Sequence, residues 1–394
     1  MIKLQSILVF LYSTILISES TVLGNAFSYY SGLPRYVPFF LILLSIFLVQ
    51  RRFLNLVIFR PSIYMFVIVV GLLISLAFFD ASHFLRSFKI IAFCYVLFSS
   101  VNPEEMTGRF LTSSLYLSNL GLIVALLFFS LPDNLSFTPD FLSSLRRFDE
   151  GFTGEFYWMK SFSGIFMIGD NPSPLFDGVP RYSGYYPEPG INAFYVLLGY
   201  AGLLYRGQKV SKLTNIITLS NVLLTFSVAG FLASFVLVGY FIARRFSRAQ
   251  RISLLTLTPF ILLVAFNRII YQDNYFADKL LGRSAQVTTG TWSNLFSFNL
   301  SGTESIFHLL NVGEFAVLPQ LLAIIIFGYI IWMCLFKFLV MGPNLKYDSG
   351  AFFFIALVFF LKSGVILLTH LVLTVIIFIP ILGRHRSCVL RHEV

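Results

Sequence analysis

The chain has 394 residues, of which 57% are hydrophobic and only 12% are charged, and its formal net charge is +10. A soluble domain carries about 25% charged residues, so we expect lipid rather than water to surround most of this protein. A β-barrel would show short segments of alternating polar and apolar residues. The three cysteines of this chain form no CxxC pair that would indicate a zinc site or a disulfide framework. We therefore predict an all-α polytopic integral membrane protein.

Apolar runs divide the chain into candidate membrane spans, each close to the roughly 20 residues that cross a bilayer. The first run follows Lys3 and lacks a clear small-residue cleavage site, which predicts a retained first helix. Three of the runs are short, at 88–102, 230–243 and 350–363. About 12 transmembrane helices are predicted, at approximately 4–23, 36–50, 62–79, 88–102, 110–131, 190–206, 213–228, 230–243, 252–268, 315–338, 350–363 and 364–382.

The distribution of charge orients these spans. If both termini are cytoplasmic, most of the 28 Lys and Arg residues and few of the 18 Asp and Glu residues fall on the inner segments. The basic residues lie on short connections that would face an anionic inner leaflet, so no nucleic-acid partner is expected. Two outer loops, at 132–189 and 268–314, are much longer than the other connections, and long loops in compact domains tend to be functional.

The first long loop ends in the stretch "RYSGYYPEPG" at 181–190, which places Arg181 and Glu188 at the mouth of a membrane helix. Its tyrosines, Tyr182, Tyr185 and Tyr186, suit either a membrane interface or stacking on sugar rings. For a single arginine at this position, snorkelling to the interface is an equally good interpretation. Glu188 has the alternative role of bonding the first backbone N–H groups of the following helix.

The second long loop places Arg283, Trp292 and His308 ahead of another span, and a shorter outer connection carries Arg86. Several cations near the outer surface indicate an anionic partner there, although the rest of that surface is net acidic. A pyrophosphate on a lipid carrier fits, because the arginine fork binds phosphate oxygens in bidentate fashion. The sequence shows no DxD or paired-Asp site, so we expect no metal and no cofactor.

The stretch "RYSGYYPEPGINAF" resembles the Arg-x-x-Gly-x-x-x-Glu-Pro pattern of the O-antigen polymerase/ligase family, of the Wzy type, with Arg181, Gly184, Glu188 and Pro189 at the patterned positions. The stretches around 224–245, 282–292 and 308–322 are also similar to that family, so the resemblance covers roughly 180–322. It implies one membrane domain over 1–394 with a GT-C-like fold. It also implies a bacterial inner (cytoplasmic) membrane location, with the loops at 132–189 and 268–314 in the periplasm.

The resemblance implies a metal-independent glycosyl transfer between two oligosaccharides, both linked to undecaprenyl pyrophosphate. Arg181 and Arg283 would hold the pyrophosphate, and Glu188 would take the acceptor's proton or orient Arg181. Membrane lipid, a chain-length regulator and a flippase of the same pathway are the other expected partners. The residues expected to bind substrate are Arg86, Tyr182, Gly184, Tyr185, Tyr186, Pro189, Trp292 and His308.

Three alternatives stay open from the sequence. The first is a ligase of the same family, but ligases carry a His-Asn pair where Gly302 aligns here, which favours a polymerase. The second is a flippase-type transporter, which would place charged residues along mid-span positions instead of in outer loops. The third is a structural subunit of the pathway, which would not need Arg181 or Arg283.

Overall fold

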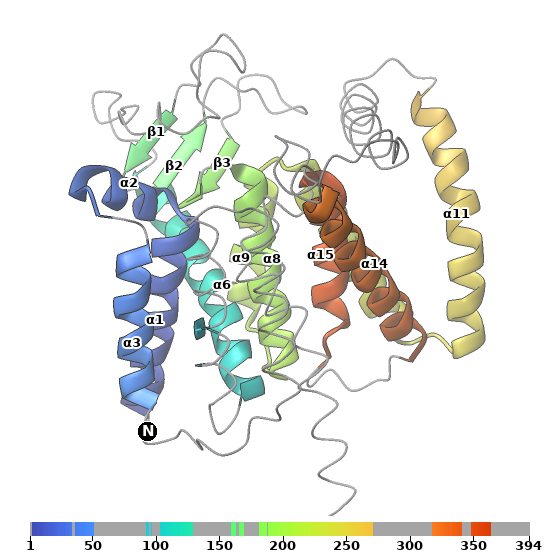
Figure 1. Ribbon diagram of the computed structural model, residues 1–394. Coiled ribbons are helices and arrows are strands. Elements are labelled where there is room, and N and C mark those ends of the chain that lie inside the picture. Colours follow the sequence, from blue (N-terminus) through green and yellow to red (C-terminus); the bar gives the residue numbers. More distant parts are fainter. Residues whose placement is uncertain are drawn as a thin grey trace, which may run out of the picture.

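The computed structural model describes residues 2–33, 36–50, 92–93, 96, 103–128, 159–162, 165–168, 181–186, 188–270, 317–340 and 348–363. This part of the chain is mostly helical (Figure 1). The helices are α1 (Ile2–Ser20), α2 (Val22–Ser31), α3 (Tyr36–Gln50), α6 (Pro103–Phe128), α8 (Pro189–Tyr205), α9 (Lys212–Leu224), α10 (Val228–Ala243), α11 (Arg248–Ile270), α14 (Val317–Val340) and α15 (Gly350–Ser363).

Most of these helices coincide with predicted spans. The predictions at 36–50 and 350–363 agree with α3 and α15 at both ends, and those for α1, α6, α8, α9, α10, α11 and α14 agree to within a few residues, apart from the earlier start of α6. The short helix α2 was not expected; Thr21 begins it, and Gly32 ends it in the left-handed conformation. The predicted spans at 62–79 and 364–382 and most of 88–102 lie outside the described residues.

Helix α8 forms the centre of the described bundle and packs against α6, α9, α10 and α15 (Figure 1). It is apolar and buried on nearly all sides, as expected for a core helix. Glycines allow α6 to approach it closely: a Cβ atom added to Gly199 would lie 2.6 Å from both the Cβ and the backbone nitrogen of Leu115. The register between α6 and α8 therefore depends on a position without a side chain.

Helices α6 and α9 bury polar side chains and expose apolar ones. On α6 the buried face carries hydroxyl and amide side chains beside apolar ones, whereas Leu120, Leu126 and Leu127 are exposed. On α9, Thr218 and Asn221 are buried, while apolar side chains occupy the exposed face. The exposed apolar side chains of α9 are Leu213, Ile216, Leu219 and Leu223. Contiguous exposed apolar surface of this kind needs an apolar environment or a partner.

The lengths and composition of the described helices agree only in part with the many membrane spans predicted from the sequence. Among the described residues, one helix is both long and apolar enough to cross a membrane, at Glu105–Leu127. Shorter apolar helices occur at Ser6–Ser18, Val37–Val49, Val228–Ala243, Gly328–Val340 and Gly350–Phe359.

A small sheet lies at one end of the bundle, so the all-α prediction is wrong in this detail. Strands β1 (Met159–Phe162), β2 (Ile165–Ile168) and β3 (Arg181–Gly184) pair antiparallel in that order (Figure 1). Phe162 pairs with Ile165, and the β2–β3 register is irregular between Phe166 and Met167. All three strands belong to the loop predicted at 132–189, and β3 leads directly into α8.

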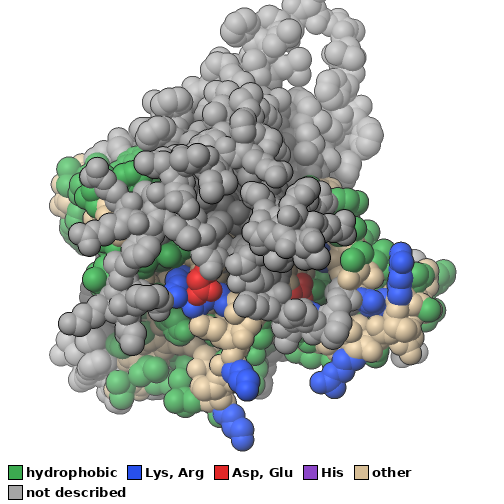
Figure 2. All heavy atoms as spheres, turned by 90° about the horizontal axis from the view of Figure 1, so that it is seen from below, with side chains coloured by type: hydrophobic (Ala, Val, Ile, Leu, Met, Phe, Trp, Pro, Cys, Tyr) green, Lys and Arg blue, Asp and Glu red, His purple; other side chains and the backbone are tan. Residues whose placement is uncertain are grey.

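Basic side chains gather at the opposite end, where α8 and α10 finish and α9 and α11 begin (Figure 2). We name this the cationic end. Lys209, Lys212, Arg245 and Arg248 are exposed there. The connections predicted as inner and those predicted as outer lie at opposite ends of the described bundle.

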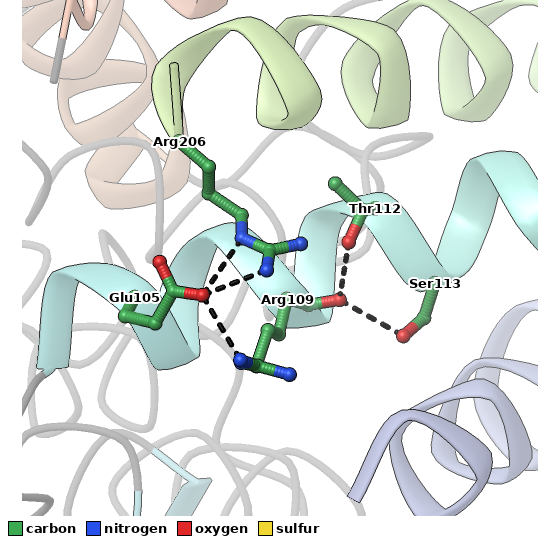
Figure 3. Close-up of polar contacts among 5 residues, drawn as sticks. All are labelled: Glu105, Arg109, Thr112, Ser113 and Arg206. Carbon is green, nitrogen blue, oxygen red and sulfur yellow. Dashed lines mark hydrogen bonds and ion pairs between the residues drawn. The ribbon is translucent and has the colours of Figure 1, made fainter. Parts of the chain in front are cut away.

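Two carboxylates at the cationic end are bound by arginines. Glu105 Oε1 accepts from Arg206 Nε at 3.0 Å and Nη2 at 2.7 Å, and it lies 3.1 Å from Arg109 Nη2 (Figure 3). The Arg206 stem lies against Gly108 of α6, where a Cβ atom would approach its Cγ to 2.5 Å. These contacts join the start of α6 to the end of α8.

The second carboxylate joins α10 to the start of α15. Asp348 forms an ion pair with Arg244 and accepts hydrogen bonds from the Tyr240 hydroxyl, at 2.9 Å to each oxygen, and from the Gly350 N–H at 2.9 Å. The Tyr240 hydroxyl also lies where a side chain on Gly350 would be. The cationic end is thus held by two separate ionic contacts.

Candidate functional site

The site predicted from the sequence forms one compact segment, which we name the β3–α8 turn (residues 181–186 and 188–189). Strand β3 ends at Gly184, and Glu188, in an extended conformation, precedes Pro189 at the first position of α8. The Glu188 carbonyl accepts from the N–H groups of Ile191 and Asn192, each at 3.1 Å. Its side chain makes no capping hydrogen bond to the first turn of α8.

Arg181 is anchored to the turn between α9 and α10. Its Nε donates to the carbonyl of Thr225 at 3.3 Å, and the side chain is half-buried. Thr225 ends α9, and the next residue, Phe226, has a φ of 43°, which is unusual for a bulky residue. The hydrogen bond fixes the plane of the guanidinium group and links β3 to a segment 44 residues further along the chain.

The three tyrosines of the turn are packed inside the protein. Tyr186 is fully buried, and its ring stacks on Tyr195 of α8 with 4.6 Å between centroids and 4° between planes. Tyr182 and Tyr185 lie against α6, where a Cβ atom on Gly121 would approach the Tyr182 Oη to 3.0 Å. Burial raises the pKa of each of these hydroxyls above the ordinary tyrosine value. Their contact with sugar stays a prediction, and their role in the structure is to hold the turn.

Gly184 satisfies two requirements at once. Its φ of +63° lies in the left-handed region that favours glycine, and a Cβ atom there would lie 2.9 Å from Asn192 Oδ1. The turn could not fold this closely over α8 with a side chain at this position. The glycine of the Arg-x-x-Gly pattern therefore has a clear structural reason.

Beneath the turn lies a chain of polar contacts that the sequence reasoning missed. Asn192 Nδ2 donates to Asn221 Oδ1 at 3.0 Å, Asn221 Nδ2 to Asn119 Oδ1 at 3.2 Å, and Asn119 Nδ2 to Thr218 Oγ1 at 3.2 Å. All four side chains are buried, and they come from α6, α8 and α9. We name this set the asparagine ladder. The available signal was the presence of asparagine within each of three apolar runs, which is typical of interhelical bonding.

Other predicted site residues lie outside the described residues: Arg86, Arg283, Trp292 and His308. Their positions relative to Arg181 and Glu188 stay predictions. The described site thus consists of Arg181, Tyr182, Gly184, Tyr185, Tyr186, Glu188 and Pro189.

Comparison of the chain with models of protein families, with curated proteins and with solved structures gave no match. The chemistry of the site must therefore be argued from its own geometry. An arginine of fixed orientation can bind an anion, and a carboxylate at the start of a helix can accept a proton. Both groups lie at the sheet end of the bundle, away from the cationic end (Figure 1).

Proposed function

We propose that the protein is a glycan polymerase of the bacterial inner membrane, of the Wzy type, acting at the outer face. It would join oligosaccharide repeat units carried on undecaprenyl pyrophosphate, as in O-antigen or a similar surface polysaccharide. About 12 transmembrane helices in a GT-C-like arrangement, with both termini cytoplasmic, complete the proposal. The Arg-x-x-Gly-x-x-x-Glu-Pro pattern supports the family, and the described geometry supports a site at that pattern.

One observation carries the proposal: Arg181 and Glu188, both half-buried, belong to a single turn that is packed against α6, α8 and α9. The turn is fastened by the hydrogen bond from Arg181 to Thr225, by packing of its tyrosines on α6 and α8, and by the close approach of Gly184 to Asn192. A snorkelling arginine at a membrane surface would need no such framework. A catalytic pair does, because misplacement by about 1 Å costs roughly a hundredfold in rate.

The distribution of polar and apolar side chains supports the membrane location. Helices α6 and α9 bury polar side chains and expose leucines and isoleucines, which suits lipid. The cationic end suits the cytoplasmic surface, where basic residues predominate, and the β3–α8 turn then faces the periplasm. Lipid-linked repeat units are presented on that side in the proposed reaction.

In the proposed reaction, a hydroxyl of the acceptor repeat unit attacks the anomeric carbon of the donor glycan. The new glycosidic C–O bond forms as the bond from that carbon to the pyrophosphate oxygen breaks. Glu188 receives the hydroxyl proton, and the guanidinium of Arg181, with that of Arg283, neutralises the charge on the departing lipid pyrophosphate. A chain-length regulator and the flippase of the same pathway would act beside it.

A deletion strain tests this function against its alternatives. Loss of a polymerase leaves single repeat units attached to the final acceptor, and these become long chains again when the wild-type gene is supplied. Full-length polymer retained on undecaprenyl pyrophosphate would instead indicate a ligase, and repeat units trapped in the inner leaflet would indicate a flippase. Either of these results would refute the polymerase proposal.

A further inference from the structure

The asparagine ladder lies within one helical turn of both groups of the proposed site. Asn192 follows Glu188 by four residues, and its backbone N–H donates to the Glu188 carbonyl at 3.1 Å. Asn221 precedes Thr225, the residue that accepts from Arg181, by the same spacing on α9. A contact between Asn192 and Asn221 therefore couples the helix start that bears Glu188 to the helix end that anchors Arg181.

The ladder also contacts the turn directly. Asn192 Nδ2 donates to Asn221, whereas Asn192 Oδ1 has no hydrogen-bond partner among the described residues. This oxygen lies against Gly184. Asn192 is fully buried, so its two polar atoms meet the turn on one side and α9 on the other. This side chain is the point at which β3, α8 and α9 come together.

We propose that the asparagine ladder is the positioning element of the site, which sets the placement of Glu188 relative to Arg181. The inference rests on the proposed function and deepens it. The ladder residues do not touch substrate; they act through the two groups that do. Their role is to fix the axial register of α8 and α9 at the end of the helices that bears the turn.

Physical chemistry favours asparagine for this task. In an apolar environment an amide that loses its partner has no water to replace it, so a register shift that breaks the ladder is unfavourable. A leucine surface would accept several registers at similar cost. The same logic accounts for single buried asparagines that specify register in coiled coils.

The ladder predicts a graded series of variants. Asn221 is the central member, and Asn221→Leu removes two of the three hydrogen bonds, which leaves Asn192 Nδ2 without its acceptor and Asn119 Oδ1 without its donor. Thr218→Val removes only the terminal acceptor without changing the shape of the side chain, and Thr218→Ser keeps that acceptor. Tyr240→Phe is the matched control, because it removes the two part-buried hydrogen bonds to Asp348 at the far end of the bundle.

The experiment combines steady-state kinetics with hydrogen exchange on the purified full chain. We expect Asn221→Leu to lower kcat for polymerisation at least tenfold with a change in KM of less than threefold, and Thr218→Val to lower kcat two- to fourfold. Thr218→Ser and Tyr240→Phe should retain kcat. Amide exchange in 181–186 should be at least fivefold faster in Asn221→Leu and unchanged in Tyr240→Phe.

A triple variant, Asn119→Leu/Asn192→Leu/Asn221→Leu, separates positioning from simple stability. It leaves no unpaired asparagine amide, so its thermal stability should recover relative to Asn221→Leu, whereas kcat should stay low. Recovery of kcat together with stability would overturn the proposal, as would wild-type exchange in 181–186 of Asn221→Leu. If the wild-type protein makes no polymer, the proposed function fails, and the exchange data still decide whether the ladder holds the turn.

Discussion

Neutralising Glu105 should destabilise the protein more than any change to an exposed charge at the same end. Its carboxylate is 25% exposed, whereas the guanidinium side chains of Arg206 and Arg109 that it binds are 9% and 11% exposed. Glu105→Gln therefore leaves two nearly buried cations beside a neutral amide. Removing one partner of a buried ion pair costs about 3–5 kcal/mol. The partial exposure of the carboxylate and the acceptor oxygen that glutamine retains reduce the expected cost to about 2–3 kcal/mol.

Thermal unfolding of the purified protein in detergent measures this loss. Glu105→Gln should unfold several degrees below the wild type, while Arg245→Gln, at an exposed cation of the cationic end, should stay within about 0.5 kcal/mol of it. The double variant Glu105→Gln/Arg206→Gln should lose less than the sum of its single changes, because it removes one of the stranded cations. If Glu105→Gln and Arg245→Gln unfold at the same temperature, the reasoning on this contact is refuted.

Three further predictions follow from the packing. Gly199→Ala should lower the unfolding temperature, because the new methyl group meets Leu115. Gly239→Ala, with no atom within 4 Å of the new Cβ, should unfold at the same temperature as the wild type. Equal unfolding temperatures for the two variants would contradict the α6–α8 contact. Gly184→Ala should speed proteolysis near the turn through its positive φ and its clash with Asn192, and unchanged cleavage would count against the turn geometry. The raised pKa of Tyr182 keeps this side chain neutral in the native state, so above about pH 10 the unfolded chain ionises first and the free energy of unfolding falls as pH rises. Tyr182→Phe should reduce that fall, as measured by unfolding at pH 8 and pH 10.5, and an identical pH dependence would refute it.

The helices were predictable because apolar runs bounded by charged residues fix both their length and their ends. The limits of α3 follow from such boundaries, because Arg35 precedes it and Arg51 follows it in the sequence. The Arg181–Pro189 segment was also correctly placed at the entrance of a helix. These are local properties, and the sequence states them directly.

Contacts between distant segments were not predictable in the same way. Strands β2 and β3 have four residues each, which is too short for an alternating polar and apolar pattern to predict their pairing. The contact of Glu105 with Arg206 and the pairing of Asn192 with Asn221 depend on how helices rotate about their axes, which apolar composition does not specify. The burial of Tyr186 against Tyr195 depends on the same rotation.

The most direct test of the central claim is polymerisation by the purified protein. One lipid-linked repeat unit would be incubated with wild type, Arg181→Ala and Arg245→Gln in the presence of EDTA, and the products resolved as a ladder on a gel. The account predicts a ladder from the wild type and from Arg245→Gln, and none from Arg181→Ala although it is folded. A ladder from Arg181→Ala, or none from the wild type with its correct substrate, would contradict it.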